Sequence, residues 1–294
     1  MGDAGLLGVD KPVEFGGSGL DFSYAMVCSE SLGLVNGGSV PMGTGVQISM
    51  ATPALARYGS DELRKEFLAP SISGDYVACL GVSETGAGSD VASIKTNARR
   101  VGGDWVINGG KMWTTNGAQA DWMCVLANTG DGQAHKNKSL IVVPMKTKGI
   151  EIVKKLNKLG MRASDTVQTF FDEVKVPVRY TIGQPGQGFI YQRQQFQEER
   201  LWAGAGTLMP DGTQYADYAN VHNYICRKPA IIDNMAWVNA DPLFRGWTDS
   251  IYVEYGKTWR KGFAGSPFAK DGRRPSCFVK PRSRRAAMSP PSFT

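Results

Sequence analysis

The middle of the chain, from residue 74 to residue 178, consists of short runs of β-forming residues that are separated by turns, with no helical pattern between them. Strands that follow one another without intervening helices favour antiparallel pairing, because parallel neighbours need long crossover connections. We therefore expect an antiparallel β-barrel or sandwich in this region. The predicted strands cover residues 76–83, 94–101, 105–107, 111–114, 122–127, 140–144, 150–153 and 166–171.

One dipeptide within this region gives a specific turn signal. Asn108-Gly109 lies between the runs 105–107 and 111–114. Both central residues of a two-residue type I′ turn need positive φ, which Asn and Gly adopt most readily. The sequence therefore predicts a tight hairpin at this point.

Helical patterns flank the β-rich region on both sides. Residues 22–32 and 46–51 have helical spacing, and Ser60 before two acidic residues is typical of a helix start. A further helix is predicted from about Phe189, with Phe196, Leu201 and Leu208 on its apolar face. These patterns predict the α+β fold class. The expected parts are helical residues 1–73, a β-domain at 74–180, the start of a second helical part at 181–210, and an irregular tail at 211–294.

Composition excludes several classes of protein. Of the 294 residues, 42% are hydrophobic and 20% charged, as in globular proteins, and no apolar run is long enough to cross a bilayer. The net charge of +6 comes from the last 40 residues, which hold ten Lys and Arg against one acidic residue, so we expect no nucleic-acid partner. Five cysteines without a C-x-x-C pair indicate a reducing compartment, and two histidines offer little material for a metal site.

Two motifs in the β-rich region are candidates for ligand binding. The first is GVSETGAGSD at residues 81–90, where small residues allow a ligand to approach the backbone; most glycine-rich turns, however, are only turns. The second is KMWTTNG at residues 111–117, where a Trp beside hydroxyls can stack on a flat ring; a lone Trp on a strand is more often part of the core. Neither motif is a P-loop or a dinucleotide fingerprint.

Together the two motifs, in this order and at this spacing, resemble the signature of the acyl-CoA dehydrogenase family. Further blocks in the same order support the resemblance, which runs from about Val9 to Met209: residues 12–21, 58–63, 159–162 and 171–177. The resemblance implies FAD as cofactor, with the first motif around the flavin and the Trp-containing segment beside its ring system, where Thr115 lies close to N5. The residues that it implies for the cofactor are Leu80, Val82, Ser83, Gly88, Ser89, Trp113, Thr114 and Thr115.

The resemblance also implies a reaction, the α,β-desaturation of an acyl-CoA thioester. In the long-chain and isovaleryl branches of the family, the catalytic carboxylate lies on the helix after the β-domain, directly before an Arg. This sequence has Glu199 and Arg200 there, so Glu199 is the predicted base, and Ser89, Gln197 and Arg200 are the predicted substrate-binding residues. A carboxylate in a pocket closed over an apolar chain has a raised pKa, which suits a base near neutral pH. The alternative is that Glu198, Glu199 and Arg200 form a solvated charged turn of helix.

The two ends of the chain depart from the family pattern. Compared with the family, we expect a shortened N-terminus and a C-terminal region, 211–294, that is divergent or frame-shifted. A comparison of the genomic and transcript reading frames would test the frame-shift. The chief alternative to an active dehydrogenase is therefore an inactive truncated remnant or partner subunit of the same fold, and a third possibility is an oxidase or monooxygenase. An intact member would form a homotetramer, pass electrons to electron-transfer flavoprotein, and work in the mitochondrial matrix of a eukaryote or the cytoplasm of a bacterium.

Overall fold

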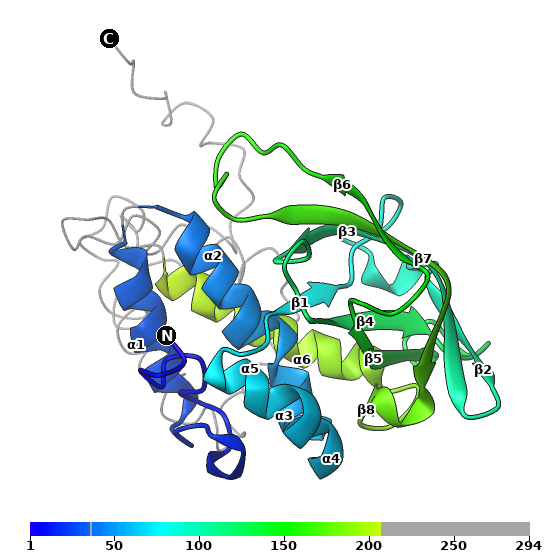
Figure 1. Cartoon of the computed structure of the whole chain (residues 1–294), viewed down its shortest axis with the longest axis horizontal. Coiled ribbons are helices and arrows are strands. Elements are labelled where there is room, and N and C mark those ends of the chain that lie inside the picture. The colour runs from blue at the N-terminus through cyan, green and yellow to red at the C-terminus, as the bar shows by residue number, and fades with distance from the viewer. Residues whose placement is uncertain (36, 207–294) are drawn as a thin grey trace, which may run out of the picture. The chain divides into compact units, whose positions relative to one another are not determined.

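The computed structural model describes residues 1–35 and 37–206, all of which belong to one compact unit (Figure 1). The predicted tail at 211–294, residues 207–210 and Leu208 on the predicted helix face lie outside the described residues. Helices come first, a sheet follows, and a long helix ends the described chain. This order confirms the α+β fold class. Within the described residues, no helix is long and apolar enough to span a membrane.

The N-terminal part is helical, as predicted. Asp21 caps its first helix by accepting a hydrogen bond from the Ser23 backbone N–H, and Ser60 caps a later one through the Leu63 N–H, which confirms the predicted start at Ser60. The predicted helix at 46–51 continues directly from α2 as a π-helical segment. The elements are η1 (Val13–Phe15), α1 (Phe22–Gly33), α2 (Ser39–Gly45), η2 (Val46–Ala51), α3 (Pro53–Tyr58), α4 (Asp61–Leu63), η3 (Arg64–Leu68) and α5 (Ala69–Ser73).

The following residues form one eight-stranded sheet with the order β6-β7-β3-β2-β4-β5-β8, and β1 pairs with β4 off this path. The short helices η4 (Val91–Ser93) and η5 (Val178–Tyr180) interrupt the succession of strands. The strands are β1 (Ala78–Gly81), β2 (Asn97–Val101), β3 (Asp104–Thr115), β4 (Trp122–Asn128), β5 (Lys138–Pro144), β6 (Ile150–Lys155), β7 (Thr166–Pro177) and β8 (Thr181–Ile182).

The sheet is mixed, which corrects the prediction of a purely antiparallel domain. β1 runs parallel to β4, and β2 also has one parallel pairing with β4, whereas the other pairings are antiparallel. A parallel pair needs a long connection between its strands. Here the hairpin of β2 and β3 lies within that connection, so no crossover helix is required. The prediction did not include the β1–β4 pair because the absence of helices between strands was its only ground for antiparallel pairing.

The predicted hairpin at Asn108-Gly109 is wrong. The two residues lie inside β3, at an irregularity in its pairing with β7, and the tight turn between β2 and β3 is formed by Gly102 and Gly103. Gly109 has a φ of +138°, and a Cβ there would lie 2.6 Å from the Thr96 Oγ1. Close approach of another backbone segment, rather than a turn, therefore requires this glycine.

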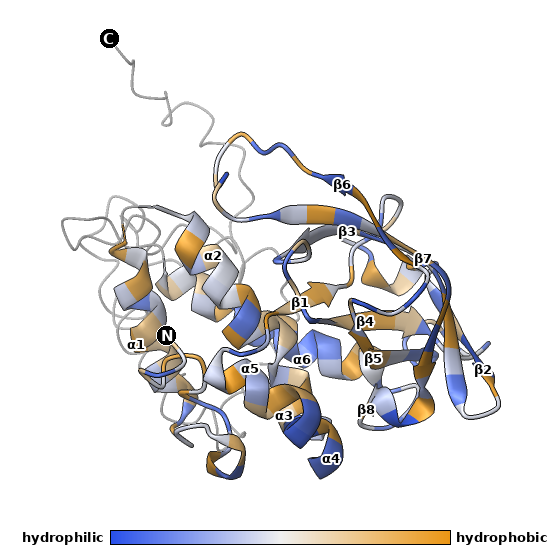
Figure 2. Ribbon diagram, viewed as in Figure 1, coloured by the Kyte–Doolittle hydropathy of each residue, from blue (hydrophilic) through white to orange (hydrophobic). Residues whose placement is uncertain are grey.

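The core lies where the helices meet β4 and β5. Most residues of these two strands are apolar (Figure 2) and fully buried. The helix after the sheet, α6 (Gly188–Ala205), packs against α1, η2 and β5. Its buried face differs from the predicted apolar one: Phe196 and Leu201 are only half-buried, whereas Gln192, Gln195, Glu198 and Trp202 are buried.

Candidate active site

The glycine-rich turn and the Trp-containing segment, predicted as two parts of one site, lie side by side. The Met112 backbone N–H donates to the Ser83 carbonyl at 2.8 Å, and the Lys111 ammonium donates to the Val82 carbonyl at 3.0 Å. Glu84 and Ala87 exchange backbone hydrogen bonds, which close the turn on itself. The first motif is thus fixed to β3 immediately before Trp113.

A buried ion pair holds this junction. Lys111 Nζ lies 2.8 Å from Glu84 Oε1, and the Glu84 carboxylate also accepts from the backbone N–H groups of Lys95 and Thr96 at 2.7 and 3.0 Å. Burial lowers the pKa of Lys111 to about 8 although Glu84 opposes the shift. Burial alone would raise the pKa of Glu84, but the charge of Lys111 and the hydrogen bonds from Lys111, Lys95 and Thr96 together outweigh it, and the pKa is lowered. At neutral pH both groups are therefore charged.

Trp113 has an unusual conformation for an aromatic residue on a strand. Its φ is +64° at an irregularity in the pairing of β3 with β7, and its side chain is 61% exposed. Positive φ at a bulky residue is rare, and such outliers gather at binding sites. The flat face of the indole is therefore available to a ligand, which argues against the alternative of a core Trp.

The other predicted cofactor residues surround this indole at different depths. Thr114 is fully buried, and its hydroxyl has no hydrogen-bond partner, whereas the half-buried Thr115 hydroxyl lies 3.3 Å from that of Thr166. In the first motif Val82 is buried, Leu80 and Ser83 are half-buried, and Gly88 and Ser89 are exposed. Backbone and hydroxyl groups thus line a surface that an extended, flat ligand can cover.

A cavity of about 450 Å³ opens beside the turn. The turn residues 84–87 form one wall, and residues 93 and 95–97 together with parts of β3, β6 and β7 supply the rest, including the exposed Phe170. On the β3 side, Gly109 and Gly110 lie between the side chains of Asn108 and Lys111. The cavity therefore has the size and mixed lining of a small-molecule site.

Glu199 lies on α6 with the properties that a general base requires. Burial raises the pKa of its carboxyl group to about 7, although Arg200 opposes the shift. The Glu199 Oε2 atom is buried without a hydrogen-bond partner. Arg200 lies over the Phe196 ring at 5.7 Å, and Gln197 is half-buried beside it. The buried Oε2 atom argues against a solvated turn at this segment. A buried carboxyl oxygen without a partner is also a candidate functional group.

The neighbouring carboxylate has a different environment. Glu198 is 2% exposed and forms an ion pair with Arg57 of α3. Burial raises the pKa of Glu198, and Arg57 opposes this shift. Sequence reasoning missed Glu198, Arg57, Lys111 and Glu84 as functional residues. Glu84 and Lys111 stand inside the two motifs, which was the available signal, whereas no local pattern links Arg57 with Glu198.

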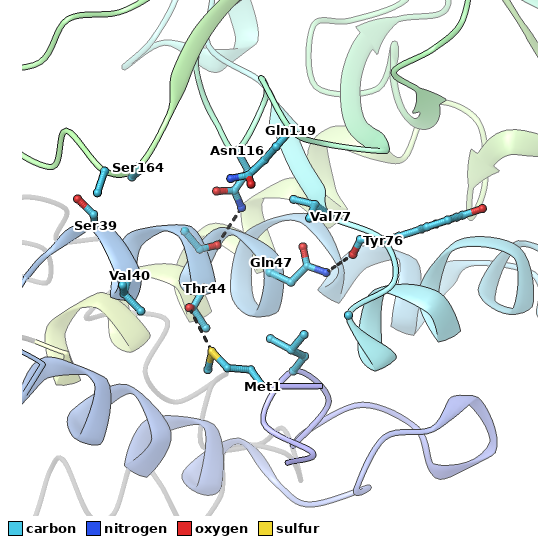
Figure 3. A pocket seen from close by; sticks show the side chains of 14 residues that line it. Met1, Ser39, Val40, Thr44, Gln47, Tyr76, Val77, Asn116, Gln119 and Ser164 are labelled. Carbon is cyan, nitrogen blue, oxygen red and sulfur yellow. Dashed lines mark hydrogen bonds between the residues drawn. The ribbon is translucent and has the colours of Figure 1, made fainter. Parts of the chain in front are cut away.

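The helix α2 connects the Trp-containing segment with α6. Asn116 Nδ2 donates to the Gly43 carbonyl at 2.9 Å (Figure 3), and two residues further the indole of Trp202 lies against Gly45, where a Cβ would approach it to 2.4 Å. Trp202 is one helical turn from Glu199. Among the hydrogen bonds and ion pairs of residues 1–35 and 37–206, none joins Glu199 to either motif directly.

A second cavity, of about 330 Å³, lies beside α2 and is lined by both Gly43 and Asn116 (Figure 3). Ser39, Thr44 and Gln47 of the helical segment, together with Asn116, point toward it. Among residues 1–35 and 37–206, no charged side chain lines this cavity, and the Gln47 amide is already bonded to the backbone of Ser71, Tyr76 and Ala78.

The fold and site together define a class: an α+β protein in which a β-sheet presents a surface for a flat ligand and the next helix carries a carboxyl group that titrates near neutrality. Comparisons with known proteins identify the class further. The profile of the acyl-CoA dehydrogenase N-terminal domain matches residues 1–75, and that of the middle domain matches residues 79–174. The chain belongs to the acyl-CoA dehydrogenase family.

Individual relatives agree with this assignment. The mitochondrial 2-methylacyl-CoA dehydrogenase of Solanum tuberosum is 37% identical over 208 residues, which cover 71% of this chain and 50% of the relative. A probable acyl-CoA dehydrogenase from Mycobacterium abscessus is 33% identical with a TM-score of 0.68, over 77% of this chain and 59% of that one. A Bacillus anthracis acyl-CoA dehydrogenase complexed with FAD is 31% identical with a TM-score of 0.65, over 70% and 35%. The chain spans about half the length of the curated relatives it matches.

Proposed function

We propose that this chain acts as a flavin-dependent dehydrogenase of an acyl-CoA thioester, with Glu199 as the base that removes the α-proton. The observation that carries the proposal is the Glu199 carboxyl group, whose Oε2 is buried without a partner and whose pKa lies at about 7. A base of this pKa is deprotonated in a useful fraction at neutral pH and still holds the proton it removes. The family relationship gives this group its substrate class.

FAD is the proposed cofactor. Two observations support this proposal: the Trp113 indole is exposed, and the Thr114 hydroxyl is buried without a partner. The cavity of about 450 Å³ adjoins the glycine-rich turn, but its lining does not include the residues proposed to hold the flavin. When bound, the flavin supplies the acceptor for the β-hydride. The residues proposed to hold it are Leu80, Val82, Ser83, Gly88, Ser89, Trp113, Thr114 and Thr115.

The remaining proposed residues act on the substrate. An α-CH group is acidic enough only when the adjacent thioester carbonyl is polarised, so the substrate must be held with its α-carbon at Glu199. Ser89, Gln197 and Arg200 are the proposed contacts to the CoA portion, and the Arg200 guanidinium supplies positive charge for it. Desolvation of the Glu199 carboxyl group keeps its pKa raised, although the residue as a whole is only half-buried.

The proposed setting follows the relatives. Electron-transfer flavoprotein is the proposed electron acceptor and a homotetramer the proposed assembly. Several of the relatives are named as mitochondrial proteins, so we propose the mitochondrial matrix as the location in a eukaryote and the cytoplasm in a bacterium.

One experiment tests the proposal. The 294-residue chain is purified with added FAD, its visible spectrum is recorded, and acyl-CoA thioesters are added without oxygen. We expect a yellow protein whose colour is bleached by at least one acyl-CoA. A colourless protein would favour the inactive remnant or partner subunit, and a yellow protein that no thioester bleaches would contradict dehydrogenation. Rapid return of colour with oxygen would favour an oxidase.

A further inference from the structure

A cluster of four charged residues joins three segments that are distant in the sequence, and of these residues Lys11 and Glu198 are buried whereas Asp10 and Arg57 are partly exposed. Arg57 of α3 pairs with Glu198 of α6, and Lys11 pairs with Asp10 at 2.5 Å. Lys11 and Asp10 both act on the pKa of Glu198 through their charges, so the two pairs lie within electrostatic reach of each other. Lys11 and Glu198 are each 2% exposed. Two positive and two negative charges balance, as buried charges must.

Polar contacts reinforce the same face of α6. The Gln195 amide donates to the Met50 carbonyl and accepts from the Ala54 backbone N–H at 3.1 Å. Tyr58 donates to Gln194, and its ring stacks on that of Tyr191 with centroids 3.9 Å apart. Directional contacts of this kind specify the rotation of a helix about its axis more strictly than an apolar face does, because a small turn breaks them.

The rotation of α6 determines which of two chemically identical side chains is left without a partner. Successive helix residues point about 100° apart. Glu198 and Glu199 are both glutamates, so a rotation of α6 by about 100° would carry Glu199 into the direction that Glu198 now takes. The position of the guanidinium on α3 therefore decides which carboxylate forms the ion pair and which one remains unpaired.

We propose that Arg57 is a positioning residue: by binding Glu198 it sets the rotation of α6 and leaves Glu199 as the unpaired carboxyl group. This inference rests on the proposed function for the role of Glu199, but the anchoring of α6 is independent of catalysis. Arg57 does not touch the substrate and acts only through α6. Replacement of Arg57 must therefore change the environment of Glu199 rather than remove a contact to the ligand.

The test compares Arg57→Met with Arg57→Lys and with the control Arg179→Met. Arg179 also forms an ion pair, with Glu66, but it is exposed, and the pair joins η5 to η3 without a residue of α6. Hydrogen–deuterium exchange of the amides in α6 is measured in the full-length chain. We expect exchange in α6 to rise about tenfold or more in Arg57→Met, with smaller change in Arg57→Lys and none in Arg179→Met. Unchanged exchange in α6 of Arg57→Met would overturn the proposal.

A second measurement separates positioning from a general loss of stability. The rate of anaerobic bleaching by an acyl-CoA is followed against pH. Loss of the Arg57 charge by itself would raise the pKa of Glu199, whereas greater exposure of Glu199 would lower it. We expect the apparent pKa to fall from about 7 toward the usual carboxyl range, and Arg57→Lys to restore it. A uniform loss of rate at all pH values with an unchanged pKa would contradict positioning.

Two further outcomes are distinguishable. If Arg57→Met does not fold, Glu198→Gln keeps the size of the side chain and leaves unpaired only the Arg57 guanidinium, whose side chain is 23% exposed, and the same rise in α6 exchange is expected. Protection of α6 equal to that of the unaltered chain would then overturn the proposal. If the unaltered chain is not bleached at any pH, the proposed function fails, and the exchange measurement alone decides whether Arg57 anchors α6.

Discussion

Glu198 and Glu199 are adjacent on α6 but have opposite surroundings: the first forms a buried ion pair with Arg57, and the second has a buried Oε2 atom without a partner. Two carboxyl groups whose environments differ in this way can serve different roles, one structural and one chemical. The first carboxylate stabilises the packing of α6 against α3. The second retains an unsatisfied acceptor oxygen.

Replacement of Glu199 by Gln therefore abolishes proton abstraction while preserving the shape of the side chain. General bases contribute about 10²- to 10⁴-fold to rate, so we expect the rate of bleaching by acyl-CoA to fall by about a thousandfold. The measurement is anaerobic stopped-flow absorbance of the FAD-loaded chain. Glu151→Gln, at an exposed position on β6, serves as the control and should leave the rate unchanged. A loss of less than about tenfold in Glu199→Gln would assign the base to another residue.

The stability of the chain should depend on pH through the same residue. Burial raises the pKa of Glu199 from the model-compound value of 4.5 to about 7. Because the folded-state pKa of Glu199 is above the unfolded one, the folded chain binds more protons than the unfolded chain between pH 4.5 and 7. The contribution of Glu199 to the free energy of unfolding is therefore full below pH 4.5 and is lost as the pH rises through 7.

Glu199→Gln should consequently be more stable than the unaltered chain at pH 8, by about 3 kcal/mol in the free energy of unfolding. The difference should disappear at about pH 4.5, because both chains then hold an uncharged side chain at this position. Urea unfolding at the two pH values measures this difference, and no catalytic activity is needed. Equal stability at pH 8 would show that the carboxylate is solvated in the folded chain.

The sequence was sufficient to predict the α+β class and the alternation of helical and β-rich parts, because period and turn chemistry act locally. It also predicted that the two motifs act together, and the backbone bond between Met112 and Ser83 places them side by side. It predicted the helix that carries Glu199 from its unbroken pattern. The role of Glu199 itself remains a prediction from family resemblance, which its burial and raised pKa now support.

The failures all concern contacts between distant segments. Asn108-Gly109 has the local signature of a turn, but the Asn108 amide bonds to Glu173 of β7 and Gly109 lies against Thr96, so tertiary contacts override the turn. The apolar spacing of Phe196 and Leu201 predicted an apolar inner face on α6. The buried face instead carries Glu198, whose partner, Arg57, is 141 residues earlier, and hydrophobic periodicity contains no information on such pairs.

The buried pair of Lys111 and Glu84 should be essential for the shape of the glycine-rich turn. Lys111→Met leaves the Glu84 carboxylate buried without its cation, which costs about 3–5 kcal/mol of unfolding free energy. In a double-mutant cycle with Glu84→Gln, we expect a coupling energy of about 1–3 kcal/mol by urea unfolding. The same variants should lose bound FAD on gel filtration. Additive effects of the two substitutions would mean that the ion pair does not hold the turn.

Gly109 offers a test of the corrected structure of β3. A Cβ at this position would lie 2.6 to 2.9 Å from three atoms of Thr96, and the φ of +138° is one that L side chains rarely adopt. Gly109→Ala should therefore reduce the free energy of unfolding by about 2 kcal/mol or more, since both strain and steric contact oppose the folded state.

Gly103 is the matched control, because nothing lies within 4 Å of the Cβ that an alanine would add there. Gly103→Ala should change stability by less than about 0.5 kcal/mol. Thermal unfolding of both variants measures the two losses of stability. A loss in Gly109→Ala no larger than that in Gly103→Ala would contradict the close contact of Gly109 with Thr96.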